Sequence, residues 1–210
     1  MILEIQNNKE LVPLEHYLTK WSQSDADEIA TRTGVSFDGT AFIVSLYGVD
    51  YTITHPDFSI TAEAEDAIAV HYIPAQILLL RYLLEGKKIM SSGKFLTFRE
   101  TPWGPVYVTP FTGRCLTRAA FTFGFKLSQF AAGMELLGGK KLPTGDVGYE
   151  VEALDGFKIQ MMVWAGDDEF PPSCQILFSD NFPKSFEAED LCVFCDILIS
   201  DIKSKMLKKI

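Results

Sequence analysis

Apolar residues recur at steps of three and four along several long stretches of the chain. These stretches are residues 8–21, 73–85, 114–137 and 185–206. Because residues at such steps share one face of a helix, the spacing predicts four helices. The third stretch is the longest and is apolar on two faces, and Gly138-Gly139 follows it as a stop signal. We therefore expect residues 114–137 to form one central, buried helix.

A period of two replaces this spacing elsewhere in the chain. Residues 41–47, 51–54, 149–154 and 157–164 alternate as strands do, and residues 174–178 resemble a further strand. Asp155-Gly156 separates two of these segments and is typical of a two-residue hairpin turn.

The predicted elements together indicate an α+β fold. We expect an antiparallel-rich mixed sheet packed against the long buried helix, with terminal helices flanking it. The 16 phenylalanines predict a core rich in Phe. We divide the chain into an N-terminal helical segment, residues 1–34, and a single α+β domain, residues 35–210.

Charge and composition restrict the partners. Nineteen Lys and Arg against 28 Asp and Glu give a net charge of −9, and an acidic surface repels a phosphate backbone, so we expect no nucleic-acid partner. The most apolar segment, residues 73–84, is too short to span a bilayer and contains Arg81, so we expect no membrane insertion. Residues 1–9 lack the pattern of an export signal, and the four cysteines then predict reduced thiols in the cytoplasm.

An acidic break between two predicted strands is the first candidate for chemistry. Asp167, Asp168 and Glu169 precede Phe170 and a diproline. Adjacent carboxylates repel one another unless a cation, a basic side chain or backbone amides balance them. One interpretation is a metal site in which Asp146, and also Asp180, adds oxygen ligands; a second is a general acid–base pair; a third is an ordinary acidic surface turn.

A second candidate lies in residues 100–114, which carry two glycines, three prolines and three aromatics and therefore predict an irregular loop. Long anchored loops often carry binding residues. We expect Trp103, Phe111 and Arg114 to form a cofactor-binding site there, together with residues from other segments. Trp103, Trp164 and Phe170 would stack on a flat ligand, and His71 or His55 would supply an axial group. The alternative is that the aromatic side chains only fill the core.

Two cysteines form a C-x-x-C pattern at Cys192 and Cys195, inside a predicted helix. A structural zinc site needs four ligands, and no second pair of this kind exists. A redox pair is expected at the start of a helix rather than within one. We interpret these residues as buried free thiols, and their redox activity stays open.

Several short motifs, taken in order, resemble a known family. They are Thr97-Phe98-Arg99-Glu100, Pro110-Phe111, Leu137-Gly138-Gly139, Gly145-Asp146, Asp168-Glu169-Phe170-Pro171 and Ile176-Leu177-Phe178. This set resembles the DUF3786 family of uncharacterised proteins from anaerobic bacteria and archaea, over residues 25–200. The resemblance implies a role in anaerobic metabolism and assigns no reaction. Some relatives carry an iron–sulfur cysteine cluster that this chain lacks, so that cofactor is not expected.

These observations leave three functional hypotheses and no assigned catalytic residue. The first is a cytoplasmic binding protein for a small cofactor or anionic ligand, such as a corrinoid or another tetrapyrrole. The second is a metal-dependent hydrolase that uses Asp167, Asp168 and Glu169 with a divalent metal. The third is a protein–protein interaction module.

Overall fold

A computed structural model describes residues 8–64 and 67–207, and so most of the segment searched for an export signal, residues 1–7, lies outside the described residues. The described residues form two compact units. The N-terminal unit contains residues up to Ser45 together with Val49–Lys88, and the C-terminal unit contains Leu46–Gly48 and the residues from Ile89 onward. The division predicted between residues 34 and 35 stays a prediction, because compactness does not test which segments fold independently.

The N-terminal unit combines four helices with a small sheet. Strand β1 pairs with β2, and β3 pairs with β4, in both cases antiparallel. Asp25 caps the N-terminus of α2, because its carboxylate accepts a hydrogen bond from the Glu28 amide at 3.0 Å. The elements are α1 (Asn8–Ser22), α2 (Ala26–Thr33), β1 (Ser36–Phe37), β2 (Ala41–Leu46), β3 (Val49–Thr54), β4 (Ile60–Ala62), α3 (Ile68–His71) and α4 (Ile73–Glu85).

The C-terminal unit is built on an antiparallel sheet with the strand order β7-β8-β9-β5, and β6 pairs with β7. The strands are β5 (Phe95–Thr97), β6 (Lys140–Leu142), β7 (Val147–Leu154), β8 (Phe157–Trp164) and β9 (Ser173–Ser179). The predicted hairpin is confirmed, since Leu154 pairs with Phe157 around a turn in which Gly156 has a φ of 77°. These elements confirm the α+β class and the antiparallel-rich sheet.

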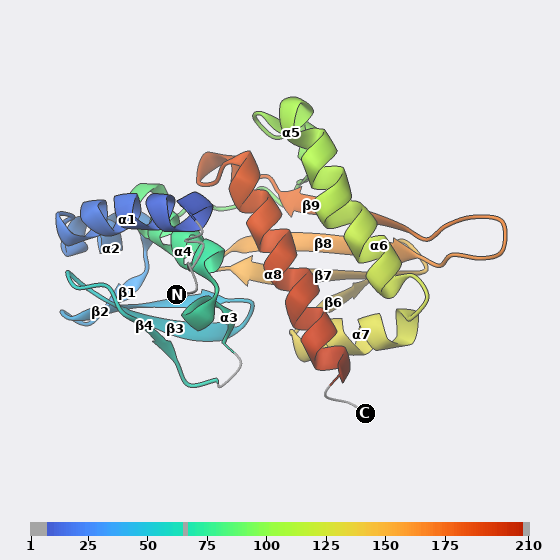
Figure 1. Ribbon diagram of the computed structural model, residues 1–210, viewed down its shortest axis with the longest axis horizontal. Coiled ribbons are helices and arrows are strands. Elements are labelled where there is room, and N and C mark those ends of the chain that lie inside the picture. Colours follow the sequence, from blue (N-terminus) through green and yellow to red (C-terminus); the bar gives the residue numbers. More distant parts are fainter. Residues whose placement is uncertain (1–7, 65–66, 208–210) are drawn as a thin grey trace, which may run out of the picture. The chain divides into compact units, whose positions relative to one another are not determined.

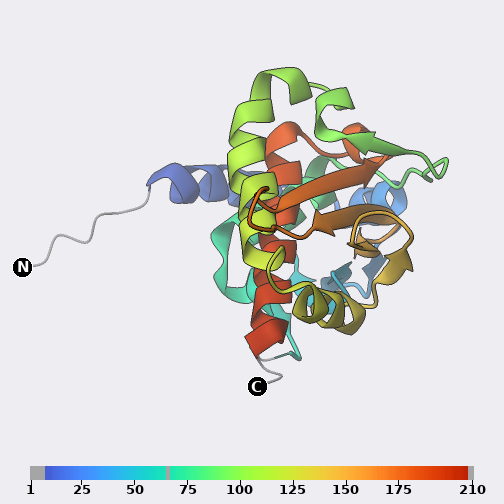
Figure 2. The ribbon, with the colours of Figure 1, turned by 90° about the vertical axis from the view of Figure 1, so that its right-hand side faces the viewer.

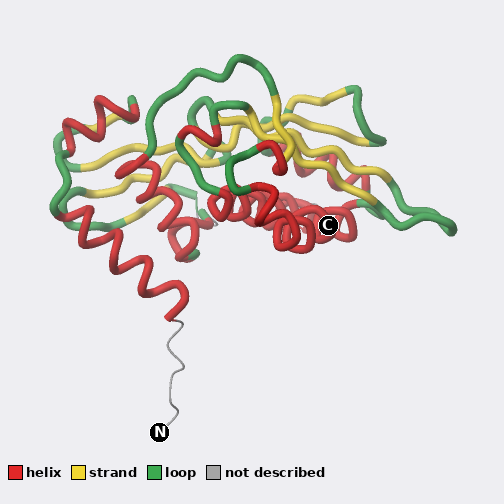
Figure 3. Tube along the Cα trace, turned by 90° about the horizontal axis from the view of Figure 1, so that it is seen from above, coloured by secondary structure: helices red, strands yellow, loops and turns green. Residues whose placement is uncertain are grey.

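Helices cover one face of this sheet. They are α5 (Gly104–Phe111), a π-helical turn (Thr112–Thr117), α6 (Arg118–Phe123), α7 (Leu127–Leu136) and α8 (Ala188–Leu207). The segment from α5 to α6 lies beside α8 across the strands (Figure 1), and a quarter turn of the view shows the same arrangement (Figure 2). Seen from above, the strands of this unit lie in one layer and these helices in another (Figure 3).

Two predictions about the helices are wrong. The stretch of residues 100–114 is not irregular throughout, because α5 begins at Gly104, shortly after a 3-10 turn at Phe98–Glu100. The second proline of this stretch, Pro105, falls in the first turn of α5, where a missing N–H does little harm. The single helix over residues 114–137 is divided in two, because α6 ends at Phe123 and α7 begins at Leu127.

Close packing requires a glycine beside this break. A Cβ atom on Gly124 would overlap Pro172, so only glycine allows the two backbones to approach this closely. Two aromatic residues beside the break, Phe121 and Phe125, are 58% and 63% exposed, so this part of the segment is not buried on both of the predicted faces.

The core of the C-terminal unit is rich in phenylalanine, as predicted. Phe157, Phe182, Phe186 and Phe194 meet edge to face, with ring centroids 4.9–5.3 Å apart. Among the described residues, no helix has the length and apolar character that crossing a membrane requires.

Candidate functional site

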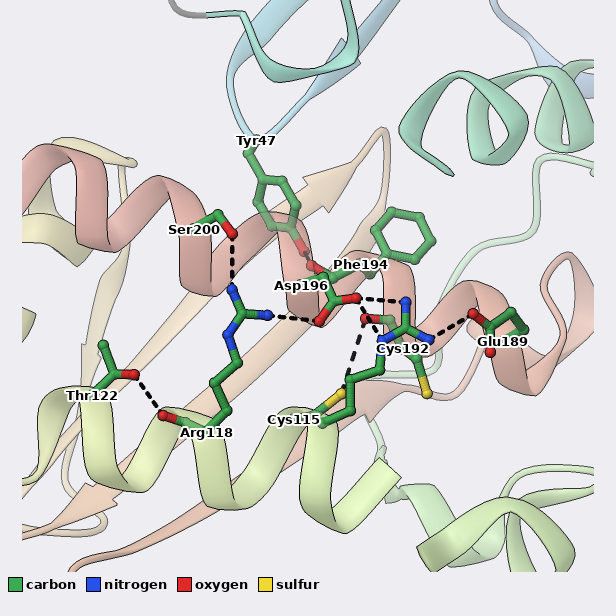
Figure 4. Close-up of polar contacts among 10 residues, drawn as sticks. Tyr47, Cys115, Arg118, Thr122, Glu189, Cys192, Phe194, Asp196 and Ser200 are labelled. Atoms are coloured by element: carbon green, nitrogen blue, oxygen red, sulfur yellow. Dashed lines mark hydrogen bonds and ion pairs between the residues drawn. The ribbon is translucent and has the colours of Figure 1, made fainter. Parts of the chain in front are cut away.

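Arg114, predicted to bind a ligand, instead holds two carboxylates of α8. It lies on the π-helical turn, and its Nε donates to Asp196 Oδ2 at 2.6 Å while one terminal nitrogen donates to Glu189 Oε1 at 2.6 Å (Figure 4). Burial opposes the charge on Arg114, but the hydrogen bonds that it donates to Asp196 and Glu189 outweigh this effect and raise its pKa. Arg114 is therefore permanently charged and already engaged.

A second arginine completes this network. Arg118 donates to Asp196 Oδ1 at 2.8 Å and to Ser200 Oγ at 3.0 Å (Figure 4). The Asp196 side chain is only 9% exposed and thus lies between two guanidinium groups. Tyr107 donates to Glu189 Oε2 at 2.6 Å, and this hydrogen bond raises the pKa of Tyr107 to about 12. Two arginines and two carboxylates balance, so the network links α8 to the π-helical turn without a net charge.

Three cysteines lie next to this network. Cys115, on the π-helical turn, directs its sulfur toward the Cys192 carbonyl at 4.0 Å, and Cys195 is buried one turn further along α8. The hydrogen bond with Cys115 and burial raise the pKa of Cys192, and burial raises the pKa of Cys195. All three thiols are free and buried, as the sequence predicted for Cys192 and Cys195.

The acidic turn is held by its own backbone. Asp167 accepts hydrogen bonds from the amides of Glu169 at 2.9 Å and Phe170 at 2.7 Å, and these bonds lower its pKa. Asp146 accepts from the Ala165 amide at 2.8 Å, and Asp168 and Glu169 are exposed to solvent. Across residues 8–64 and 67–207, no group of three or more His, Cys, Asp and Glu side chains is placed to hold a metal ion. Backbone amides thus account for the two carboxylates that are engaged.

Asp180, the further oxygen ligand considered for that metal site, lies at the other end of β9. Its carboxylate accepts from Ser91 Oγ at 2.6 Å and from Ser92 Oγ at 2.5 Å, and these hydrogen bonds lower its pKa to about 2. It ties the segment before β5 to the end of β9.

The aromatic residues predicted to stack on one ligand are spread along the C-terminal unit. Trp103, 72% exposed, precedes α5, whereas Phe170, 67% exposed, belongs to the turn whose base packs on Gly124 after α6. The continuous helical segment between them has twenty residues, Gly104 to Phe123, and spans roughly 30 Å. The structure therefore does not bring Trp103 and Phe170 together, and Trp164 lies half-buried at the end of β8.

Both candidate histidines belong to the N-terminal unit. His71 is exposed at the end of α3. His55 packs edge-on against Trp21 with ring centroids 5.0 Å apart, and its Nε2 lies 3.2 Å from Ser24 Oγ. These contacts give His55 a packing role within its own unit.

A pocket of about 190 Å³ lies where β5 ends, in the C-terminal unit. Thr97 pairs with Leu177, and a longer β5 would place Phe98 opposite Ile176 and Arg99 opposite Gln175. The chain instead turns away, because the Glu100 carboxylate accepts from both the amide and the hydroxyl of Thr97 at 2.7 Å. The space that this turn leaves is lined by Thr97, Phe98, Arg99, Val108, Phe111, Thr112, Leu116, Gln175 and Ile176.

The pocket has an apolar floor and a polar rim. Phe98 and Phe111 are buried and stack in parallel with centroids 4.0 Å apart, and Ile176 is buried beside β8. Arg99 and Gln175 are exposed at the rim. Phe111 is thus the one predicted cofactor-binding residue that lines this pocket.

Arg99 differs from the other four arginines. Arg32, Arg81, Arg114 and Arg118 each have a carboxylate partner. Within the described part of the chain, Arg99 has no hydrogen bond or ion pair through its side chain. A free guanidinium beside an apolar floor can bind a molecule that carries an anionic group and an apolar group.

The sequence contained signals for both groups of residues that the prediction missed. The spacing Thr97-x-x-Glu100 is a capping box, which would have ended the strand at Thr97 and placed Arg99 in a turn. Arg114 and Arg118 are four residues apart, and Glu189, Asp196 and Ser200 follow at steps of seven and four, so each set shares one helical face.

The fold and the pocket define an α+β protein with a small site at the edge of an antiparallel sheet. The sequence matches the family described as Domain of unknown function (DUF3786) over residues 25–201. Because the match covers most of the chain, the protein belongs to this family, which confirms the resemblance seen in its motifs. Neither the curated proteins nor the solved structures contain a match to this chain.

Proposed function

We propose that this protein binds a small organic anion in the pocket beside β5. The observation that carries the proposal is Arg99, whose guanidinium has no partner among the described residues and lies at the rim of an apolar floor formed by Phe98 and Phe111. A carboxylate would accept paired hydrogen bonds from Arg99, and the apolar part of the ligand would leave water for the pocket floor.

The size of the pocket sets the size of the ligand. Apolar cavities of about 150 Å³ bind benzene, and the pocket here has about 190 Å³. It therefore suits one ring or one branched aliphatic group, whereas a tetrapyrrole with four linked rings is too large for it. Binding of a small anion keeps the leading hypothesis from the sequence but moves the site from Arg114 to Arg99.

The proposal is tested by titrating the protein with benzoate and phenylacetate and, as neutral matches, benzamide and phenylacetamide. Amide chemical shifts report both affinity and location. We expect the two acids to perturb residues lining the pocket and to bind more tightly than the amides. Arg99→Ala should weaken binding of the acids by about 10- to 100-fold, the equivalent of losing charged hydrogen bonds worth about 1.5–3 kcal/mol.

A matched control lies close by. Lys94 is exposed next to β5 and does not line the pocket, so Lys94→Ala removes the same charge and should leave the affinity unchanged. Millimolar acid that perturbs none of the pocket residues would contradict the proposal, as would equal losses in the two variants.

We further propose that the protein acts in the cytoplasm, within anaerobic metabolism. Support for the compartment comes from Cys115, Cys174, Cys192 and Cys195, which are all free thiols. Support for the metabolic setting comes from the family resemblance. Recovery of the protein outside the cytoplasm after cell fractionation would contradict the first of these statements.

A further inference from the structure

Strand β9 extends further than its neighbour β5. β9 covers Ser173–Ser179, and β8 pairs with it from Ser173 to Phe178. On the opposite side β5 pairs only with Leu177, Phe178 and Ser179. Among the described residues, no other strand pairs with residues 173–176 on that side. The sheet thus ends in a short free edge that lies beside the pocket.

This free edge has defined limits. At one end Thr97 closes the ladder by pairing with Leu177. At the other end β9 is preceded by Pro171 and Pro172, which have no N–H to donate. About four residues are therefore available, and their exposed backbone groups suit a partner that is itself extended.

Arg99 and the apolar floor lie at the same place as this edge. Gln175 and Ile176 belong both to the free edge and to the pocket lining, and Arg99 lines the same pocket. A ligand that occupies the place of the missing strand would therefore meet backbone groups, an apolar cavity and one cation together. Free acids such as benzoate use the last two features but leave the backbone groups without a partner.

We propose that the organic anion is the carboxylate of a short peptide with a free C-terminus. The peptide would add as an extended strand along residues 173–176, place one apolar side chain against Phe98 and Phe111, and direct its terminal carboxylate to Arg99. This inference rests on the proposed function and names the ligand class for the same pocket.

Charge and volume both favour this occupant. The chain is acidic, with a net charge of −9, yet the side chain that faces the pocket rim without a partner among the described residues is a cation, Arg99. The pocket volume of about 190 Å³ accepts one Leu or Phe side chain and excludes larger groups. The free edge of about four residues matches a tripeptide or tetrapeptide.

The test compares four synthetic probes by calorimetry and by amide shifts. They are acetyl-Ala-Ala-Leu with a free carboxylate, its C-terminal amide, its backbone N-methylated form, and acetyl-leucine alone. We expect the first to bind at least 10-fold more tightly than each of the others and to perturb the amides of residues 173–176. In Arg99→Ala the difference between the acid and its amide should disappear, whereas Lys94→Ala should keep it.

The outcomes separate this inference from the proposed function. If acetyl-leucine and benzoate bind in an Arg99-dependent manner, and the tripeptide is no tighter and insensitive to N-methylation, the pocket binds small anions and the peptide inference is wrong. If none of the probes binds, both proposals are wrong. Binding of the amide as tight as that of the acid would also overturn the carboxylate assignment.

Discussion

Arg114 and Arg99 lie near opposite sides of the same helical segment, and their surroundings differ. Arg114 leaves the π-helical turn toward α8, where it donates to Asp196 and Glu189. Arg99 lies in the 3-10 turn after β5 and has no side-chain partner among the described residues. Both are arginines in a stretch rich in proline and aromatics, so residue type alone does not distinguish them.

The difference teaches which cation can bind a ligand. A guanidinium that already holds two carboxylates would have to give up those hydrogen bonds before it could bind another anion. A solvent-exposed guanidinium exchanges only water. The π-helical turn, Thr112–Thr117, has residues in both surroundings, since Thr112 and Leu116 line the pocket and Arg114 joins the network. Such turns often occur at functional sites.

Removing Asp196 is expected to have the largest effect on stability, because it disrupts the network around Arg114. In Asp196→Ala both guanidinium groups lose the carboxylate that lies between them, and both are partly buried. We expect a loss of about 2–4 kcal/mol in the free energy of unfolding, below the range for a fully buried pair because the arginines reach solvent. Urea unfolding measures it.

Asp168→Ala is the matched control, because Asp168 is exposed in the acidic turn of the same unit. Its unfolding midpoint should stay close to that of the wild type. A loss of less than about 1 kcal/mol in Asp196→Ala would mean that the network does not hold α8 to the π-helical turn.

Replacing each arginine by lysine tests the same difference and is expected to have a smaller effect on stability. Lysine keeps the charge but cannot reach two acceptors in the fixed geometry of a guanidinium. Arg114→Lys should therefore cost about 1–2 kcal/mol of stability, because Arg114 donates to two carboxylates. Arg99→Lys should change stability by less than about 0.5 kcal/mol. Chemical denaturation of the two variants measures these losses. Equal losses in the free energy of unfolding would contradict the proposed difference between Arg114 and Arg99.

The spacing of apolar residues predicted most of the fold, because burial of one face imposes that spacing within each helix or strand. The hairpin at Asp155-Gly156 and the apolar stripe of α8 depend on residues close in sequence, and both are present. The glycine beside the division of the helix, Gly124, packs instead on Pro172, a residue far along the chain. A long-range contact of this kind leaves no periodic signal in the helical segment.

The candidate site was harder to predict for the same reason. Phe111, predicted to bind a cofactor, does line the pocket, whereas Arg99 was not among the predicted site residues. Arg114 looked available because its partners, Asp196 and Glu189, lie on a helix more than seventy residues later. A sequence indicates where cations are, whereas packing of distant elements decides which of them are already neutralised.

The smallest expected effect concerns the turn that keeps Arg99 out of the sheet. Glu100 is exposed, and its hydrogen bonds with Thr97 lower its pKa below the ordinary value of 4.5. A carboxylate with a lowered folded pKa stabilises the protein above its unfolded pKa, and this contribution is lost as the pH falls through the folded pKa.

Glu100→Gln keeps an acceptor for the capping box, and Glu100→Ala removes it. We expect the wild type to exceed Glu100→Gln in melting temperature by a small margin at pH 7. This margin should shrink as the pH falls below 4.5 and vanish once the pH is below the lowered pKa of Glu100, because both side chains are then neutral. The melting temperature of Glu100→Ala should lie below those of the wild type and Glu100→Gln at every pH. This variant should also bind benzoate more weakly, since the turn would no longer hold Arg99 at the pocket. A margin between wild type and Glu100→Gln that persists in acid would show that the charge on Glu100 is not its cause. Full benzoate affinity in Glu100→Ala would show that the capping box does not position Arg99.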